Sequence, residues 1–387
     1  MKTMEQTNQK THAGRKALPV DEVRFYSFTF FVALIIIAGY NLGIPNYYLG
    51  WLAFTVAAFS VAGNDAIQTI GTFIESKKGS TLLPKVLTFC GLLFMVHIYG
   101  WFMDNGEIHF QRLDKFAEPS SYNLIQLLAP IVLVIITRLK APISTTFLIL
   151  GLFDNKNQNI EKMLTKSFLG YGIAFASALV IWGILSVIFK KDYEGNEPEH
   201  ESPFWQNAQW ISTSYLWVAW LLQDTANIAV FLPRKLSISE VIAALSIIGF
   251  ALTTIIMTNG GKIQEVVSEK TDLKSAKAAT IVDIVYATIL LIFYKWSKIP
   301  MSTTWVFLGM LAGREVILHI MTSKDRPYLE TFRQVGKDVV LASLGIAVSI
   351  FIFVLSSIIY TKDAAVLKFV PSIILELVDP SLSLKHP

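Results

Sequence analysis

Two aspartates lie inside apolar stretches of this sequence, and side-chain amides flank each of them. The acids and their amide neighbours are Asn64, Asp65, Gln68, Gln223, Asp224 and Asn227. An ionised carboxylate inside a bilayer is costly unless it is paired or faces water. In a helix, residues three apart share one face, so each acid lies beside the amide three positions later. Carboxylate and amide oxygens form a hard ligand set that suits a cation such as Na⁺. We therefore expect Asp65 and Asp224 to bind the metal ion Na⁺ or to carry protons. The alternative is a structural aspartate that bonds free backbone groups.

A Pro-x-Ser-Thr-Thr segment occurs twice, at 142–146 and 300–304. Pro is well tolerated at the first helical position, and Ser and Thr suit the first turn, so each segment predicts a helix start. A helix N-terminus leaves N–H groups unpaired and is a natural seat for an anion. The hydroxyls expected to hold a tetrahedral oxyanion are those of Thr145, Thr146, Thr303 and Thr304. The alternative is an ordinary helix start whose hydroxyls cap amides.

These features recur in the same order at nearly the same spacing. Asp224 lies 159 positions after Asp65, and Pro300 lies 158 positions after Pro142. One Pro-x-Ser-Thr-Thr segment alone would be a weak signal. Two of them, each downstream of an aspartate in an apolar run, predict a chain built from two related halves.

The composition places these halves in a membrane. Of the 387 residues, 53% are hydrophobic and only 16% are charged, whereas soluble domains carry about 25% charge. Residues 25–64, 167–189 and 339–361 contain no Asp, Glu, Lys or Arg, and a spanning helix needs roughly 20 apolar residues. We therefore predict an all-α polytopic membrane protein.

The predicted spans define the domain organisation. They are residues 24–44, 48–75, 82–103, 121–139, 142–157, 163–190, 205–232, 236–257, 276–297, 299–320 and 335–361. The predicted units are a cytoplasmic disordered N-terminus (1–23), an extra transmembrane helix (24–44), a first repeat (48–190), a cytoplasmic connector (191–204), a second repeat (205–361) and an amphipathic tail (362–387). Basic residues near the N-terminus, such as Arg15 and Lys16, predict a cytoplasmic start. Five spans per repeat invert the second copy relative to the first. Secondary transporters commonly have such inverted repeats, with broken helices at the midplane.

Several other classes of function find no support. The net charge of +4 gives no indication of nucleic-acid binding, and a lone Cys90 provides neither a disulfide nor a cysteine metal site. The sequence contains no HExxH, GxSxG, GxxxxGK[ST] or GxGxxG pattern. We therefore expect no cofactor, and only a transported coupling ion, Na⁺ or H⁺.

The two acids and the two hydroxyl segments together predict coupled transport. A divalent anion is costly to place in the membrane, and cations at the acids would offset its charge. Each ligand then favours the binding of the other. The alternatives are an ion channel and an intramembrane enzyme that uses Asp65 and Asp224 as paired carboxylates.

The motifs resemble those of the inorganic phosphate transporter (PiT) family. Its Gly-Ala-Asn-Asp-Val-Ala-Asn-Ala type signature is similar to Ala-Gly-Asn-Asp-Ala-Ile-Gln-Thr at 62–69 and to Leu-Leu-Gln-Asp-Thr-Ala-Asn-Ile at 221–228. Its Pro-Val-Ser-Thr-Thr-His type segments resemble 142–147 and 300–305. Gln68 and Gln223 replace family Asn residues, and Phe147 and Trp305 replace the family His. The chain resembles a divergent member.

This resemblance implies Na⁺- or H⁺-coupled symport of inorganic phosphate across a plasma membrane. The expected location is a bacterial inner membrane, and a homodimer is one assembly that the resemblance allows. Related sulfate permeases keep sulfate as an alternative substrate. Asn64, Asp65, Asp224 and Asn227 would bind Na⁺. The residues that would bind phosphate and the cation are Ser144, Thr145, Thr146, Ser302, Thr303 and Thr304. Asp65 and Asp224 would also contact the substrate.

Overall fold

The architecture was obtained as a computed structural model. It describes residues 19–154, 158–188, 202–264, 276–322 and 328–361. The predictions for residues 1–18, for most of the connector 191–204 and for the tail 362–387 lie outside the described residues.

Every regular element in the described ranges is helical. The elements are α1 (Val20–Asn41), α2 (Asn46–Val61), the π-helical turn η1 (Ala62–Ala66), α3 (Ile67–Ser76), α4 (Leu82–Met103), α5 (Leu124–Arg138), α6 (Thr145–Leu148), the 3-10 turn η2 (Leu150–Phe153), α7 (Gln158–Ile188), α9 (Pro203–Ala229), α10 (Ile238–Met257), α12 (Ala276–Trp296), α13 (Thr303–Thr322), α14 (Tyr328–Ser356) and the π-helical turn η3 (Ser357–Thr361). Seven helices, α1, α4, α7, α10, α12, α13 and α14, are long and apolar enough to cross a membrane. The predicted all-α membrane class is confirmed.

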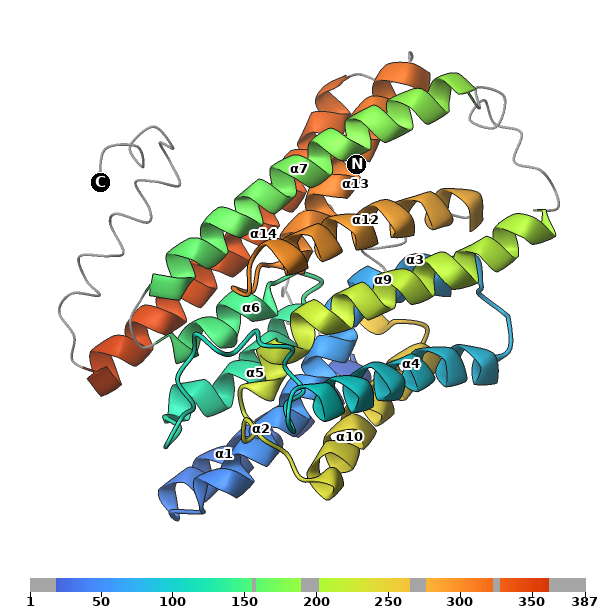
Figure 1. The fold of residues 1–387 in the computed structure, drawn as a ribbon. Helices are drawn as coiled ribbons and strands as arrows, with labels where there is room; N and C mark the ends of the chain where they lie inside the picture. The colour runs from blue at the N-terminus through green and yellow to red at the C-terminus, as the bar shows by residue number, and fades with distance from the viewer. Residues whose placement is uncertain (1–18, 155–157, 189–201, 265–275, 323–327, 362–387) are drawn as a thin grey trace, which may run out of the picture.

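The helices pack side by side in a bundle (Figure 1). α13 lies along α7, and α12 lies along α9. Glycines bring the first pair close. A methyl group added at Gly309 would lie 2.3 Å from the carbonyl oxygen of Tyr171, and one added at Gly313 would lie 2.3 Å from that of Phe175. Small residues at this four-residue spacing let two membrane helices approach closely.

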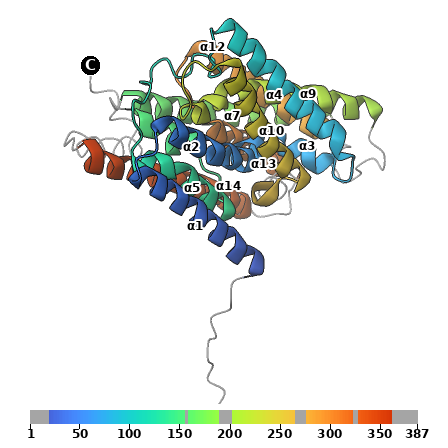
Figure 2. The ribbon, with the colours of Figure 1, turned by 90° about the horizontal axis from the view of Figure 1, so that it is seen from below.

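Helix α1 lies at the edge of the bundle (Figure 2), where it contacts α5 and α2. It begins at Val20, directly after Pro19 and four residues before the predicted start. Asp21 and Glu22 occupy its first turn, where acidic side chains stabilise a helix. Glu22 also pairs with Arg138 at the end of α5, at 2.8 Å. This edge position fits an added span.

The predicted span at 142–157 is wrong. The described part of this segment contains only the four-residue α6 and the 3-10 turn η2. Its counterpart in the second half, α13, is a helix of 20 residues. Asp154 follows η2 directly, and its Oδ2 accepts from the backbone N–H groups of Asn159 and Ile160, at 2.8 and 2.9 Å. Asp154 thus ends one segment and caps the start of α7.

In both Pro-x-Ser-Thr-Thr segments, a non-helical stretch precedes the first threonine. Residues 141–144 and 297–302 are not helical, and helices then begin at Thr145 and Thr303. The helices that carry the acids are continuous, since α2 passes through η1 into α3 and α9 runs through Asp224 to Ala229. The Asp65 region thus differs from the Asp224 region by one π-helical turn, a feature often found at functional sites.

Candidate functional site

The two Pro-x-Ser-Thr-Thr segments meet through a reciprocal pair of contacts. The Thr146 hydroxyl donates to the Met301 carbonyl oxygen at 3.3 Å. The Thr304 hydroxyl donates to the Ile143 carbonyl oxygen at 3.5 Å. Each bond runs from the fifth residue of one segment to the second residue of the other. Such exchange of equivalent contacts is what a two-fold relation between the two segments would produce; the predicted inverted repeat stays a prediction.

Asp65 lies in η1 with both carboxylate oxygens occupied. Asn64 Nδ2 donates to Oδ1 at 2.7 Å and also to the Ile143 carbonyl oxygen at 2.6 Å. The Thr145 hydroxyl donates to Oδ2, and the Thr304 side chain also interacts with the carboxylate. Asp65 therefore contacts hydroxyls from both Pro-x-Ser-Thr-Thr segments.

Asp224 joins the same network through Asn227. Asn227 Nδ2 lies 2.8 Å from Asp224 Oδ1, 3.0 Å from the Thr145 hydroxyl and 3.1 Å from the Thr146 hydroxyl. The polar chain thus runs from Asp65 through Thr145 and Asn227 to Asp224. Asp65 is 2% exposed and Asp224 is 1% exposed, so the whole chain is shielded from solvent.

A set of buried oxygens around these acids has no hydrogen-bond partner. They are Gln68 Oε1, Gln223 Oε1, Asp224 Oδ2, Asn227 Oδ1 and Ser302 Oγ. The amide orientations follow from their partners. Gln223 Nε2 donates to the Leu290 carbonyl at 2.6 Å, and Asn227 Nδ2 donates to a carboxylate. Neither acceptor can donate to an amide oxygen, so the oxygen ends are the free ends.

These free oxygens need an electropositive partner. A buried acceptor without a partner costs roughly 1–3 kcal/mol, and more if it is charged. Within the described part of the chain, no Lys, Arg or His forms an ion pair with Asp65 or Asp224. A bound cation or proton would satisfy several of these oxygens at once. The donor set therefore fits Na⁺, a hard cation that prefers oxygen ligands.

The remaining predicted site residues, Ser144, Ser302 and Thr303, differ in their hydrogen-bond contacts. Ser144 Oγ accepts from the Phe147 backbone N–H at 3.4 Å, which is the capping arrangement. The Ser302 backbone N–H donates to Ser167 Oγ at 2.8 Å and leaves its own hydroxyl free. The Thr303 side chain interacts with Asp224. Thr303 thus contacts Asp224, Ser302 has a buried hydroxyl without a partner, and Ser144 makes a local capping contact.

Two further residues support the site without having been predicted. The Tyr286 hydroxyl donates to the Thr303 carbonyl oxygen at 2.9 Å, and Ser167 holds the Ser302 backbone as described. Tyr286 is 1% exposed and comes from α12. Its only signal in the sequence is a polar hydroxyl in an apolar span, which is too common to single it out.

A second buried carboxylate cluster surrounds Asp283 on α12. The Thr72 hydroxyl donates to Oδ1 at 3.1 Å, and the hydroxyls of Ser212 and Thr213 donate to Oδ2. This cluster joins α3, α9 and α12. None of these hydrogen bonds reaches Thr145 or Asn227, so the Asp283 cluster is separate from the network around Asp65 and Asp224.

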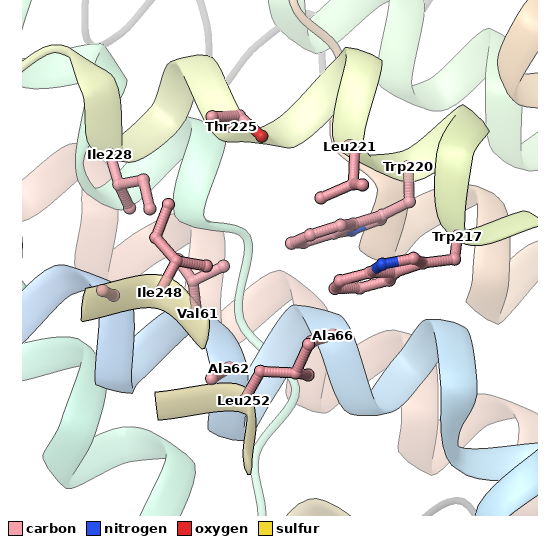
Figure 3. A pocket seen from close by; sticks show the side chains of 11 residues that line it. Val61, Ala62, Ala66, Trp217, Trp220, Leu221, Thr225, Ile228, Ile248 and Leu252 are labelled. Carbon is pink, nitrogen blue, oxygen red and sulfur yellow. The ribbon is translucent and has the colours of Figure 1, made fainter. Parts of the chain in front are cut away.

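A small pocket lies beside the site between α2, η1, α9 and α10, but its lining is almost entirely apolar (Figure 3). The rings of Trp217 and Trp220 stack along one side, with centroids 4.9 Å apart and planes 10° apart. The lining hydroxyl of Thr225 is bonded to His97 Nε2 at 2.9 Å. Trp220 Nε1 has no hydrogen-bond partner, but the lining contains no charged side chain, so the polar network and not this pocket is the candidate site.

Comparison with known proteins supports the architecture. No family model matches the sequence, and no curated protein sequence matches it. A solved structure described as "The sodium-dependent phosphate transporter" matches with a TM-score of 0.56 and 15% sequence identity. The match covers 81% of this chain and 99% of that chain. The two proteins have a similar fold. The chain is thus an all-helical membrane protein whose fold is also that of a phosphate transporter.

Proposed function

We propose that this protein is a divergent member of the inorganic phosphate transporter family that carries phosphate together with Na⁺ across a membrane. One observation carries the proposal: buried oxygens without hydrogen-bond partners lie around two aspartates that form no ion pair within the described residues. The fold shared with a sodium-dependent phosphate transporter adds support. A bacterial plasma membrane, a cytoplasmic N-terminus and a possible homodimer complete the proposal.

In this proposal the two acids bind cations with the amides beside them. Asp224 supplies its free Oδ2, and Gln223 and Asn227 supply free amide oxygens. In the first half, Gln68 supplies the free oxygen, while both oxygens of Asp65 already accept hydrogen bonds. The two halves therefore offer different ligand sets, and the Asp224 half has more free oxygens.

The anion would bind where α13 begins. α13 has 20 residues, so its N-terminal N–H groups and dipole can attract an anion at Thr303 and Thr304. α6 has a single turn, so its threonines would contribute mainly hydroxyls. Cations at the acids offset the charge of the bound phosphate, and each ligand raises the affinity of the other. This reciprocity couples phosphate to the cation gradient.

Phosphate fits the site better than sulfate, the second candidate. A free carboxylate oxygen such as Asp224 Oδ2 repels a fully deprotonated anion. The same oxygen can accept a hydrogen bond from the O–H group that phosphate retains near neutral pH. Sulfate has no such group, so it would gain no hydrogen bond to offset this repulsion.

The network also argues against an intramembrane aspartyl enzyme. That chemistry needs two carboxylates that share one proton or one water. Here Thr145 and Asn227 stand between Asp65 and Asp224 and occupy one oxygen of each. The arrangement favours ligation of ions.

Uptake into proteoliposomes tests the proposal. Purified protein should accumulate radiolabelled phosphate when an inward Na⁺ gradient is imposed, and a K⁺ gradient of equal size should give only background. Unlabelled phosphate should compete more strongly than sulfate. An inward proton gradient without Na⁺ separates H⁺ coupling from Na⁺ coupling. Absence of phosphate accumulation under every gradient would refute the proposed function.

A further inference from the structure

Two buried cationic side chains lie outside the network and bind the same pair of carbonyls. Arg112, between α4 and α5, is 1% exposed, and Lys166, on α7, is 8% exposed. Arg112 Nη1 donates to the Ser297 carbonyl oxygen at 2.6 Å and lies 3.4 Å from that of Ile299. Lys166 Nζ donates to the Ile299 carbonyl and lies 3.5 Å from that of Ser297. These carbonyls immediately precede Pro300.

The positive charge of this pair is not neutralised by an ion pair. No carboxylate of the described chain lies within ion-pair distance of Arg112 or Lys166. Carbonyl oxygens satisfy donors but carry no net charge. Burial lowers the pKa of Arg112 to about 10, so the guanidinium is charged at neutral pH. A buried guanidinium without an ion pair is costly, and an anion would relieve that cost.

The free edge of Arg112 has the shape that an oxyanion requires. The ring of Tyr294 covers one face of the guanidinium, with 4.8 Å between Cζ and the ring centroid. Nη1 is taken by the carbonyls, whereas Nε and Nη2 are buried and have no partner. Nε and Nη2 point their N–H bonds along one edge of the guanidinium. This edge binds two oxygens of a carboxylate or phosphate side by side.

The position of Arg112 connects a loop region to the candidate site. The segment 104–123 is joined to 230–237 by a bond from the Leu236 N–H to the Gly106 carbonyl at 2.8 Å, and by one from the Tyr122 hydroxyl to the Phe231 carbonyl at 2.8 Å. Arg112 also interacts electrostatically with Asp224. Arg112 therefore belongs to the joined loop region and acts electrostatically on the Asp224 half of the network.

We infer that Arg112, assisted by Lys166, forms a second oxyanion subsite that receives phosphate on its way between the joined loops, 104–123 and 230–237, and the Thr303 end of the central site. The inference rests on the proposed function for its ligand. A purely structural clamp that holds residues 297–299 explains Nη1 and Lys166. It leaves the free Nε–Nη2 edge unexplained.

Uptake kinetics of Arg112 variants test the subsite. Arg112→Gln should raise the KM for phosphate about tenfold or more, because a charge-assisted pair of hydrogen bonds is lost. The Na⁺ dependence should stay unchanged. Arg112→Lys keeps the charge but loses the two parallel N–H groups of the guanidinium edge, so its KM for phosphate should lie between those of the wild type and Arg112→Gln. Lys235→Gln removes an exposed charge from the adjoining loop and should behave like the wild type. An unchanged KM in both Arg112 variants overturns the subsite, as does a lowered kcat or Tm with KM unchanged.

A binding measurement separates this inference from the transport proposal. Inorganic phosphate, compared with chloride of equal ionic strength, should raise the Tm of detergent-solubilised wild type more than that of Arg112→Gln. If the wild type does not transport phosphate but shows this difference, the subsite stands and the transport proposal fails. Equal phosphate stabilisation of both proteins, or none in the wild type, overturns the subsite. Where Arg112→Gln does not fold, Arg112→Lys decides the same question.

Discussion

Replacement of Asp224 by Asn is the cleanest perturbation of the candidate site. Asp224 Oδ1 accepts from Asn227, while Oδ2 is free. The introduced amide can keep its oxygen toward Asn227 and place its NH₂ at the free position, so Asp224→Asn removes one charge with little steric change. Asp65→Asn is less clean, because both Asp65 oxygens accept hydrogen bonds and the new NH₂ would meet a donor.

The magnitude follows from the lost charge. A cation about 4 Å from a carboxylate is stabilised by about 4 kcal/mol at an effective dielectric constant of about 20. The amide oxygen retains a dipole and costs less to bury, which recovers about half of this energy. The remaining ~2 kcal/mol corresponds to about a 30-fold loss of cation affinity. The variant should therefore need about 30 times more Na⁺ for half-maximal uptake.

The assay is Na⁺-driven phosphate uptake into proteoliposomes across a Na⁺ titration. Asp21→Asn, which changes an exposed acid at the start of α1, is the matched control and should follow the wild type. Equal reconstitution and an unchanged Tm establish that the fold is intact. A half-maximal Na⁺ concentration within twofold of the wild type, in a folded Asp224→Asn protein, would show that Asp224 does not bind the coupling cation.

Three further predictions concern the network, the packing and the pH dependence. Thr145→Val removes the hydroxyl between Asp65 and Asn227 and should weaken Na⁺ binding at least tenfold, from about 1.5–3 kcal/mol for a bond to a charged group. Gly309→Ala forces a methyl group against the α7 backbone and should destabilise the protein by about 1–3 kcal/mol, seen as a lower Tm. Burial lowers the pKa of His109 from 6.5 to about 4. Between pH 6.5 and about pH 4, the His109 side chain is therefore protonated in the unfolded chain and neutral in the folded chain. Protonation then favours the unfolded chain, so Tm should fall as the pH drops through this window.

Each of these predictions has a matched control and a contradicting result. Thr145→Ser keeps the hydroxyl and should retain Na⁺ affinity, so equal affinities of the Val and Ser variants would contradict the network. Gly172→Ala adds a methyl group to α7 where no atom lies within 4 Å, and it should leave Tm unchanged. His109→Gln should show a smaller loss of Tm on acidification, and an unaltered pH profile would exclude His109 as its cause.

Much of the fold could be predicted from composition and local pattern. Long apolar runs determine spanning helices because backbone groups inside a bilayer must be satisfied within the segment itself. α4, for example, has the predicted bounds. The segment 142–157 was mispredicted because its apolar run resembles that of a spanning helix, whereas α6 ends at Leu148 and Asp154 caps the start of the next helix, α7. Those bonds depend on how the chain folds back to begin α7.

The chemical groups of the site were also visible in the sequence. Asp65, Asp224 and the four threonines stand out because polar groups in apolar runs need a partner or a function. Their mutual contacts were not visible. Thr146 meets Met301, and Asn227 meets Thr145, across more than 80 positions of sequence in each case. Local spacing determines which residues share a helix face, and it leaves open which faces meet.

What the sequence by itself determined is the class of the protein and the order and spacing of its acids and hydroxyl segments. The tertiary structure decided which oxygens remain free, since that depends on every donor nearby, and it assigned Gln68 and Gln223 their open carbonyl ends. The sequence places Arg112 in a loop between two predicted spans, whereas the structure shows that its guanidinium is buried and contacts the carbonyl oxygen of Ile299, next to Pro300. Burial and the direction of a side chain arise from packing between distant segments, and only the folded chain specifies them.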